Sequence, residues 1–176
     1  MRHLAARFFR ALSPAGPPHR EDAWARGWLL PGELQLWAKM SGPDRRHAVG
    51  VARDTIRLLG GDVGRPPDRA VVAAALLHDV GKVESELGTL ARAATTAAAM
   101  VAGRSRLATQ PAGTRERQWR RRVRLYLVHD EVGAKLLERA GSADQTVAWA
   151  RQHHLGPERW TVDRRTGDAL KAADGD

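Results

Sequence analysis

The sequence predicts an all-α domain, a bundle of about six or seven helices. Ala, Arg and Leu are abundant, whereas only 5% of the 176 residues are aromatic, and such a composition favours helix over sheet. No segment shows the alternation of apolar and polar residues that is typical of a half-buried strand. Clusters of Gly and Pro separate segments of helical length. The chain length is that of one domain.

Composition also limits the classes of function. The chain has no Cys, which excludes a disulfide-stapled scaffold. Its formal net charge of +9 favours anionic partners such as a nucleotide, a nucleic acid or an acidic lipid surface. No window approaches the roughly 18 consecutive apolar residues that a membrane span needs. We therefore expect a cytoplasmic protein without a transmembrane segment.

Residues 1–22 are expected to form a basic amphipathic N-terminal segment (Met1–Leu12) and a Pro-rich linker that includes Ser13–Pro18. The segment lacks the apolar centre of a secretory signal. We interpret it as a short surface helix or a frayed tail, with weak contact to a membrane or a partner as the alternative. The folded domain is then expected to occupy residues 23–176.

The first helix of this domain is expected around Trp24, Trp28 and Trp37, whose spacing of four and nine suits one helix that packs large rings onto the domain. Ser41-Gly42-Pro43-Asp44 is a helix-start signal. That second helix should run to about Leu59 and stop at Gly60-Gly61.

Pro66-Pro67-Asp68 opens the next helix, an apolar run from Ala70 to Leu77 that is expected to continue through His78–Lys82. An Ala-rich helix is expected over about residues 88–102, followed by a loop from residue 104 to about residue 118.

Another helix is expected to begin at Trp119, to tolerate Gly133 in its interior and to break at residues 141–144. Residues 144–154 are expected to be helical until Gly156-Pro157 stops them. A short terminal helix should cover about residues 166–174.

The pair His78-Asp79 is the first candidate for chemistry. In a helix, both residues lie on one face with Val71, Val72 and Ala75, so the ring and the carboxylate extend an apolar stripe toward the interior. Burying a carboxylate is costly unless it is paired. A metal ion is one suitable partner, and Arg or Lys is the ordinary alternative.

The same inward placement is expected for a further set of side chains, namely His47, His129, His153 or His154, and Asp174. A lone His on an apolar face is more often a hydrogen-bonded core residue than a ligand. Asp174 also stands near the end of the sequence, where fraying is common. The order of these residues along the chain is therefore a stronger signal than any one of them.

That order resembles the HD-domain superfamily of metal-dependent phosphohydrolases, in which an isolated His precedes a His-Asp helix and a distant Asp. The matching segments are Asp44-Arg45-Arg46-His47, Leu76-Leu77-His78-Asp79-Val80-Gly81-Lys82 and Ala169-Leu170-Lys171-Ala172-Ala173-Asp174. Branches with two metals add His residues, matched by His129-Asp130-Glu131-Val132-Gly133-Ala134 and Arg151-Gln152-His153-His154-Leu155-Gly156. The resemblance covers residues 47–174.

The resemblance implies an HD-domain helical bundle and the role of each residue. It implies that one divalent metal is held by His47, His78, Asp79 and Asp174. It implies that Asp79 bridges to a second metal held by His129 and His153. Whether His154 also binds stays open, because helix phasing with Val147 favours His154 and the distance to Gly156 favours His153. Mn, Fe, Ni, Co, Zn and Mg all suit such mixed ligands.

The catalytic roles implied by the resemblance fall on Asp79, which would orient or deprotonate water, and on Lys82, which would bind a substrate phosphate. Two family features are missing. Pro43 stands four residues before His47, where one cyclic-dinucleotide-cleaving branch has a Glu, and no Gly-Tyr-Pro follows His154. Cleavage of cyclic dinucleotides is therefore not expected.

The predicted function is a phosphomonoesterase or phosphodiesterase that acts on a nucleotide-like substrate through metal-activated water. The alternative is a non-catalytic HD-fold regulatory module that binds a nucleotide or nucleic acid. Eight Arg and one acid, Glu116, lie in Arg104–Arg124, which is either a phosphate-facing patch or a solvated helix face. Trp119 and Tyr126 in this stretch can stack on a base or pack in the core. No nucleic-acid-binding motif accompanies the patch, and the sequence does not indicate an oligomeric state.

Overall fold

The structure is a computed structural model that describes residues 15–60, 68–85, 87, 95 and 114–175. In this part of the chain the regular structure consists of eight α-helices and two short 3-10 helices, with no strand. The all-α prediction is thus confirmed. Met1–Leu12, the Ala-rich helix expected over 88–102 (apart from Thr95) and most of the loop expected over 104–118 lie outside the described residues.

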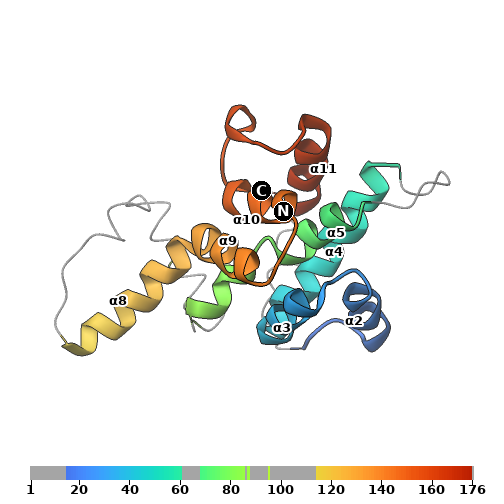
Figure 1. The fold of residues 1–176 in the computed structure, drawn as a ribbon. Helices are drawn as coiled ribbons and strands as arrows, with labels where there is room; N and C mark the ends of the chain where they lie inside the picture. Colours follow the sequence, from blue (N-terminus) through green and yellow to red (C-terminus); the bar gives the residue numbers. More distant parts are fainter. Residues whose placement is uncertain (1–14, 61–67, 86, 88–94, 96–113, 176) are drawn as a thin grey trace, which may run out of the picture.

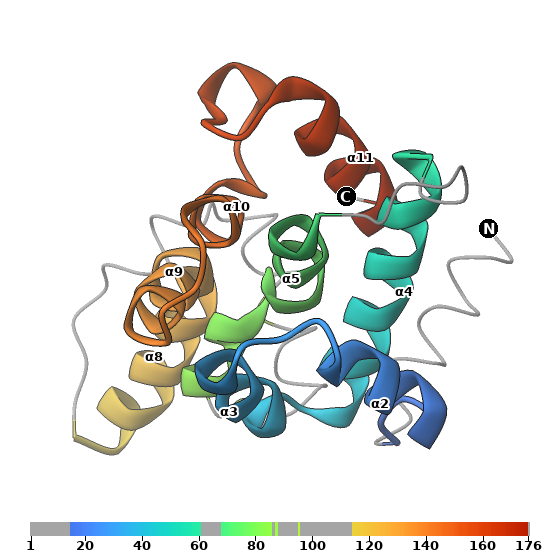
Figure 2. The same cartoon turned by 45° about the vertical axis from the view of Figure 1, so that its right-hand side comes forward.

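Helix α5 (Arg69–Leu77) lies at the centre of the bundle (Figure 2). Asp68 begins it by accepting a hydrogen bond from the amide of Ala70 at 2.8 Å. Each of the residues 71–77 is buried, because α5 packs between α4 (Gly42–Leu58) and α10 (Asp144–Gln152). Around these, α11 (Arg164–Asp174) packs on α4, and α9 (His129–Arg139) packs on α10 (Figure 1). The C-terminal end of α5 therefore lies inside the bundle.

The Trp-rich stretch forms two helices, so the expectation of a single helix is wrong. Helix α2 (His19–Arg26) and helix α3 (Pro31–Lys39) are separated by Gly27–Leu30. Leu30 is extended and donates its amide to the Glu33 carboxylate at 2.7 Å, which starts α3 with Pro31 in the first turn. The fully buried Trp37 donates its ring N–H to Asp22 at 3.0 Å and so ties α3 to α2.

The helix through His78 ends earlier than predicted. Helix α5 stops at Leu77, and the chain continues as the 3-10 helix η1 (Val80–Ser85). This segment packs against α9 so closely that a Cβ on Gly81 would lie 1.9 Å from the His129 carbonyl oxygen. Lys82 is therefore not on the same face of a continuous α-helix as His78. It bonds back to Asp79 through both its amide, at 3.0 Å, and its ammonium group.

The helix expected from Trp119 is also broken. Helix α8 begins earlier, at Thr114, and ends at Leu127, and α9 follows after Val128, whose φ is −114°. No Gly or Pro marks this break. Gly141, with φ of +73°, follows the end of α9 as predicted. Figure 1 shows α8 extending outward from the bundle, with its C-terminal end beside α9.

The last helices agree with the predicted order and differ only at their ends. Helix α10 stops at Gln152, and α11 starts at Arg164, where Asp163 accepts a hydrogen bond from the Thr166 amide. The 3-10 helix η2 (Pro157–Arg159) lies between them. Among the described residues, the structure contains no helix with the length and apolarity needed to cross a membrane.

Candidate metal centre

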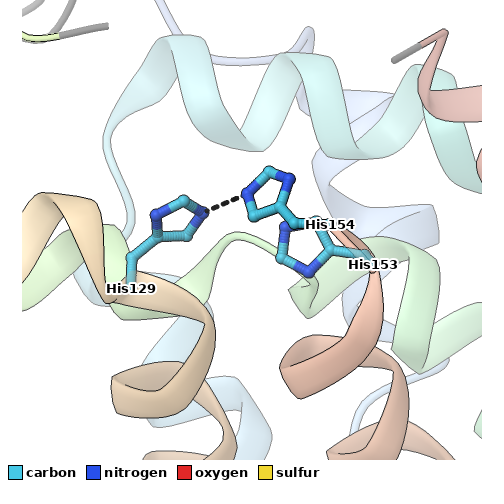
Figure 3. A group of neighbouring side chains, drawn as sticks. All are labelled: His129, His153 and His154. Carbon is cyan, nitrogen blue, oxygen red and sulfur yellow. Dashed lines mark hydrogen bonds between the residues drawn. The ribbon is translucent and has the colours of Figure 1, made fainter. Parts of the chain in front are cut away.

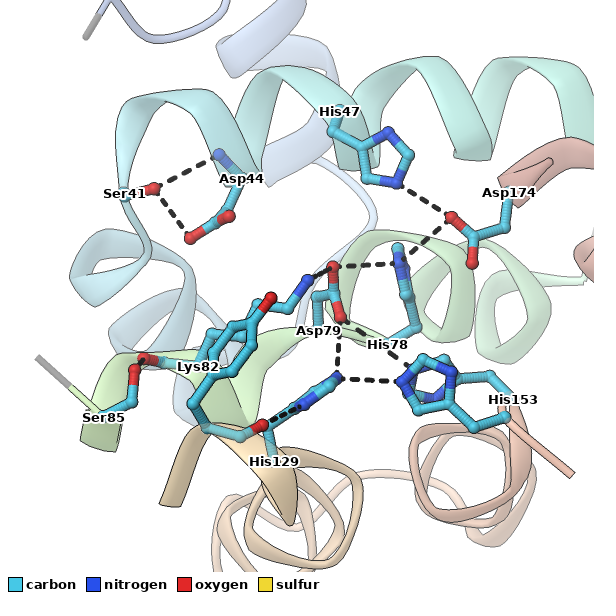
Figure 4. A network of polar contacts seen from close by, with 12 residues as sticks. Ser41, Asp44, His47, His78, Asp79, Lys82, Ser85, His129, His153 and Asp174 are labelled. Atoms are coloured by element: carbon cyan, nitrogen blue, oxygen red, sulfur yellow. Dashed lines mark hydrogen bonds and ion pairs between the residues drawn. The ribbon is translucent and has the colours of Figure 1, made fainter. Parts of the chain in front are cut away.

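The side chains that the sequence analysis named as ligands lie in one cluster (Figure 4). They come from the middle of α4, the end of α5, the start of α9, the end of α10 and the end of α11, namely His47, His78, Asp79, His129, His153, His154 and Asp174. All are buried except His47 and His154, which are half-buried. The cluster is thus interior, with two rings at its edge.

Asp79 lies at the centre of the cluster. Its Oδ1 lies 3.1 Å from Nε2 of His129 and 3.9 Å from Nε2 of His153. Its Oδ2 lies 3.4 Å from Nε2 of His78 and contacts the ammonium group of Lys82. One carboxylate thus faces two separate groups of ring nitrogens.

Asp174 closes the other side of the cluster. Its Oδ1 lies 2.8 Å from Nε2 of His47 and 3.6 Å from Nε2 of His78. The residue is only 6% exposed, and Gly175 ends α11 directly after it in the left-handed conformation. The contacts of its carboxylate therefore hold the end of α11 against α4.

Three of the rings are oriented by the same hydrogen bond. In each, Nδ1 donates to the carbonyl oxygen three residues earlier, from His78 to Ala75 (2.9 Å), from His129 to Tyr126 (2.7 Å) and from His153 to Ala150 (3.0 Å). The carbonyl requires the proton on Nδ1, so the neutral ring directs the lone pair of Nε2 into the cluster. This is the arrangement that protein metal sites use to orient imidazole ligands.

The inward nitrogens need a cation. Nε2 of His78 and Nε2 of His153 are buried without a hydrogen-bond partner, although carboxylate oxygens face both. Two lone pairs placed opposite each other repel unless a proton or a metal ion lies between them. Two groups, His47–His78–Asp79 and His129–His153–His154, have ligand atoms within 4.8 Å of one another and can each hold a metal ion. The donor set therefore fits the divalent metals expected from the sequence.

Both members of the pair His153-His154 reach the cluster (Figure 3). Nε2 of His153 faces Asp79, as given above. Nε2 of His154 lies 3.2 Å from Nε2 of His129. The alternative between the two residues is thus not decided by distance, because each ring brings a nitrogen to the group around His129.

Electrostatics sets the charge state of the centre. Burial opposes the charged form of His78, but the carboxylates of Asp79 and Asp174 outweigh it and raise the pKa of His78 to about 9. Burial also opposes ionisation of Asp79, yet the charges of Lys82 and His78 hold its pKa well below the ordinary value. Without a metal, a proton on His78 and the ammonium of Lys82 thus supply the positive charge that this carboxylate requires.

Burial and neighbouring charges also set the pKa values of Asp174 and His153. Burial opposes ionisation of Asp174, but the hydrogen bond from His47 and the charge of His78 lower its pKa. Burial, with the nearby charge of His78, lowers the pKa of His153 well below its usual range. An ionised carboxylate and a neutral imidazole are the forms that bind metals.

Close packing and one long side chain hold the elements in place. Gly81 of η1 and Gly133 of α9 lie face to face, and a Cβ on Gly81 would meet the amide nitrogen of Gly133 at 2.6 Å. This close approach places Asp79, two residues before Gly81, near His129. On the other side, the Lys171 ammonium donates to the carbonyl oxygen of His153 at 3.0 Å and links α11 to the end of α10.

Two residues at the centre were not predicted from the sequence. Tyr126, three residues before His129, stacks its ring on His129 with centroids 5.7 Å apart and an interplanar angle of 29°. Asp44, three residues before His47, adds negative charge near the Lys82 ammonium. The spacing of three residues before a predicted ligand is the signal that would have found both. Of the basic stretch Arg104–Arg124, the structure describes the side chains from residue 118 onward, on α8.

Comparison with known proteins supports the family. A model of the HD domain matches residues 45–174, a range that starts just before His47 and ends on Asp174. No curated protein and no solved structure matches the chain. The matched range covers most of the sequence and includes each of the clustered side chains, and the chain therefore belongs to the HD-domain family.

Proposed function

We propose that this protein is a metal-dependent phosphohydrolase that cleaves a phosphoester of a nucleotide-like substrate. The observation that carries the proposal is the convergence of inward Nε2 atoms on two ionised carboxylates, with two of those atoms buried and without a partner. The proposed domain spans residues 23–176, with residues 1–22 as an appended segment.

The first metal would be held by His47, His78, Asp79 and Asp174. A second would be held by Asp79 and His129 together with His153 or His154. When bound, such cations supply Lewis-acid chemistry, because they polarise phosphoryl oxygens and make water a nucleophile near neutral pH. The residues suit Mn, Fe, Ni, Co, Zn or Mg.

The chain itself supplies charge and orientation. Asp79 stays ionised, so its carboxylate can accept a hydrogen bond from a water molecule beside it and orient that water. The half-buried Lys82 adds a cation next to that carboxylate, where an ammonium group stabilises negative charge that develops on a phosphoryl group. His47 and His154 lie at the edge of the cluster, so a substrate can enter on their side.

The test combines metal content with turnover. The purified protein is analysed for bound metals and screened for phosphate release from a nucleotide panel with Mn, Ni or Mg added. Asp79→Asn should lose most of the bound metal and reduce turnover by at least about 100-fold, because its carboxylate faces both groups of rings. The matched control is Asp54→Asn, a half-exposed acid on α4 that pairs with Arg57 in the structure described, and it should change neither value. Wild-type metal content and turnover in Asp79→Asn would refute the proposal.

One observation favours a second candidate, a non-catalytic module that binds nucleotides. Lys82 already neutralises Asp79, so the cluster has an internal cation and can stay folded without a metal. This candidate predicts nucleotide binding that does not change when a chelator is added, with no release of phosphate from any member of the panel.

A further inference from the structure

We propose that a stripe of α8, formed by Trp119, Arg122 and Tyr126, extends the metal centre into a binding site for a nucleoside polyphosphate whose base stacks on Trp119. The inference rests on the proposed function, because it assumes that the terminal phosphate is held at the metal centre. It adds the class of nucleotide and the side chains that select it.

The stripe starts at the metal centre. The Tyr126 ring stacks on the His129 ring, and the Tyr126 carbonyl oxygen accepts the hydrogen bond that orients this ring. The ammonium of Lys82 is close enough to interact electrostatically with Tyr126. Tyr126 therefore borders the position where a phosphate bound by Lys82 would lie.

The stripe then runs outward along α8. Residues three, four and seven apart share one face of an α-helix, so Trp119 and Arg122 lie on the same face as Tyr126. A rise of about 1.5 Å per residue places Trp119 roughly 10 Å from Tyr126 along the helix axis. One phosphate is too short to join a base on Trp119 to the metal centre, whereas a chain of two or three phosphates spans this length. Arg122 lies between the two ends, where the inner phosphates would be.

The two outer side chains have the chemistry that such a ligand needs. Trp119 is 49% exposed and is one of two large apolar side chains, with Leu58, that are exposed in the described part of the chain. An exposed indole is a stacking surface for a base, and the guanidinium of Arg122 suits phosphate oxygens. Arg124 has the same charge but lies about 200° around the helix from Arg122, and it is exposed. It provides a matched control.

The first test measures binding without turnover. Isothermal titration calorimetry on the metal-loaded protein, at a low temperature where turnover during the titration is negligible, compares adenosine triphosphate, adenosine monophosphate and inorganic tripolyphosphate. Trp119→Ala should weaken binding of adenosine triphosphate by about 5- to 100-fold and leave tripolyphosphate unchanged, since the latter has no base. Trp119→Phe should retain most of the affinity, because a phenyl ring also stacks. Equal weakening of both ligands by Trp119→Ala, or no change in either, would overturn the base site.

The second test concerns the phosphates. Arg122→Gln should weaken both polyphosphates by about tenfold and leave adenosine monophosphate unchanged, whereas Arg124→Gln should change none of them. Equal effects of the two variants would show only a general loss of charge and would overturn the stripe. These measurements do not depend on hydrolysis. If the nucleotides bind as predicted but no phosphate is released, only the proposed function is contradicted. If the protein hydrolyses nucleotides and Trp119→Ala binds adenosine triphosphate as tightly as the wild type does, only this inference is contradicted.

Discussion

The contact between Gly81 and α9 allows a sharp test of how the candidate metal centre is assembled. A Cβ added to Gly81 would lie 1.9 Å from the carbonyl oxygen and 2.8 Å from the carbonyl carbon of His129, and 2.6 Å from the amide nitrogen of Gly133. These are backbone atoms, so no side-chain rotation relieves the clash. In Gly81→Ala, η1 and α9 must move apart.

The size of the effect follows from the distances. Ordinary contact of a Cβ atom begins near 3.4 Å, so the two segments must separate by about 1.5 Å. Asp79 precedes Gly81 by two residues, and its Oδ1 lies 3.1 Å from Nε2 of His129. These two side chains therefore move apart by a similar amount. Overpacking of this kind costs about 1–3 kcal/mol, equivalent to a Tm lower by about 3–10 °C for a chain of this size.

Thermal unfolding with and without added metal, together with elemental analysis, tests this expectation. Gly81→Ala should unfold at lower temperature and lose most of its bound metal. The control is Gly50→Ala on α4, where a Cβ meets nothing within 4 Å. It should keep the metal and raise stability by about 0.5–1 kcal/mol, because Ala is the better helix former. A Gly81→Ala protein with the Tm and metal content of the wild type would refute the argument that this contact positions Asp79.

Three further outcomes are expected. Asp163→Ala should cost about 1 kcal/mol at neutral pH, because Asp163 caps α11. Hydrogen bonds from Thr166 lower the pKa of Asp163 from 3.8, so its contribution is full above pH 4 and is lost as the pH falls further. The Tm difference from the wild type should therefore shrink in acid, and a constant difference would contradict the assignment. Lys171→Met should weaken metal affinity about tenfold, because it removes the hydrogen bond to the carbonyl oxygen of His153. Competition with a chelating dye measures this affinity. Lys171→Arg should keep the affinity near that of the wild type, and an equal loss of affinity in both variants would contradict a positioning role. Metal at a hundred times its Kd should stabilise the folded protein by about 2.7 kcal/mol. Adding a chelator should remove this stabilisation and lower the Tm accordingly, and an unchanged Tm would show that the folded protein holds no metal.

Local signals in the sequence located much of the fold. Ser41 and Asp68 start α4 and α5 as predicted, because their side chains accept hydrogen bonds from amides of the first turn. Gly60 and Gly141 follow the ends of α4 and α9 with positive φ, a conformation that Gly adopts without strain. These signals act within one helical turn, so the sequence alone was enough to find them.

Helix breaks that depend on neighbouring elements were missed. Val128 carries no breaker signal, yet the chain leaves the α8 direction there. The break places His129 at the start of α9, with Nδ1 bonded to the carbonyl of Tyr126. At Gly81 a glycine was visible in the sequence, but nothing nearby in the chain indicates that His129 packs against it.

The sequence by itself determined the helical class, the family and the residues with metal-binding chemistry. Their order and types do not depend on the path of the chain between them. Only the tertiary structure decided that Asp79 faces both groups of rings, that Lys82 bonds to it, that both His153 and His154 reach the cluster and that Tyr126 borders it. Asp79 and His129 are 50 positions apart in the chain, His129 and His154 are 25 apart, and the turn of η1 that brings Lys82 back to Asp79 is packed against α9. The spatial distances between such residues are set by how whole helices pack, and local propensity carries no information about them.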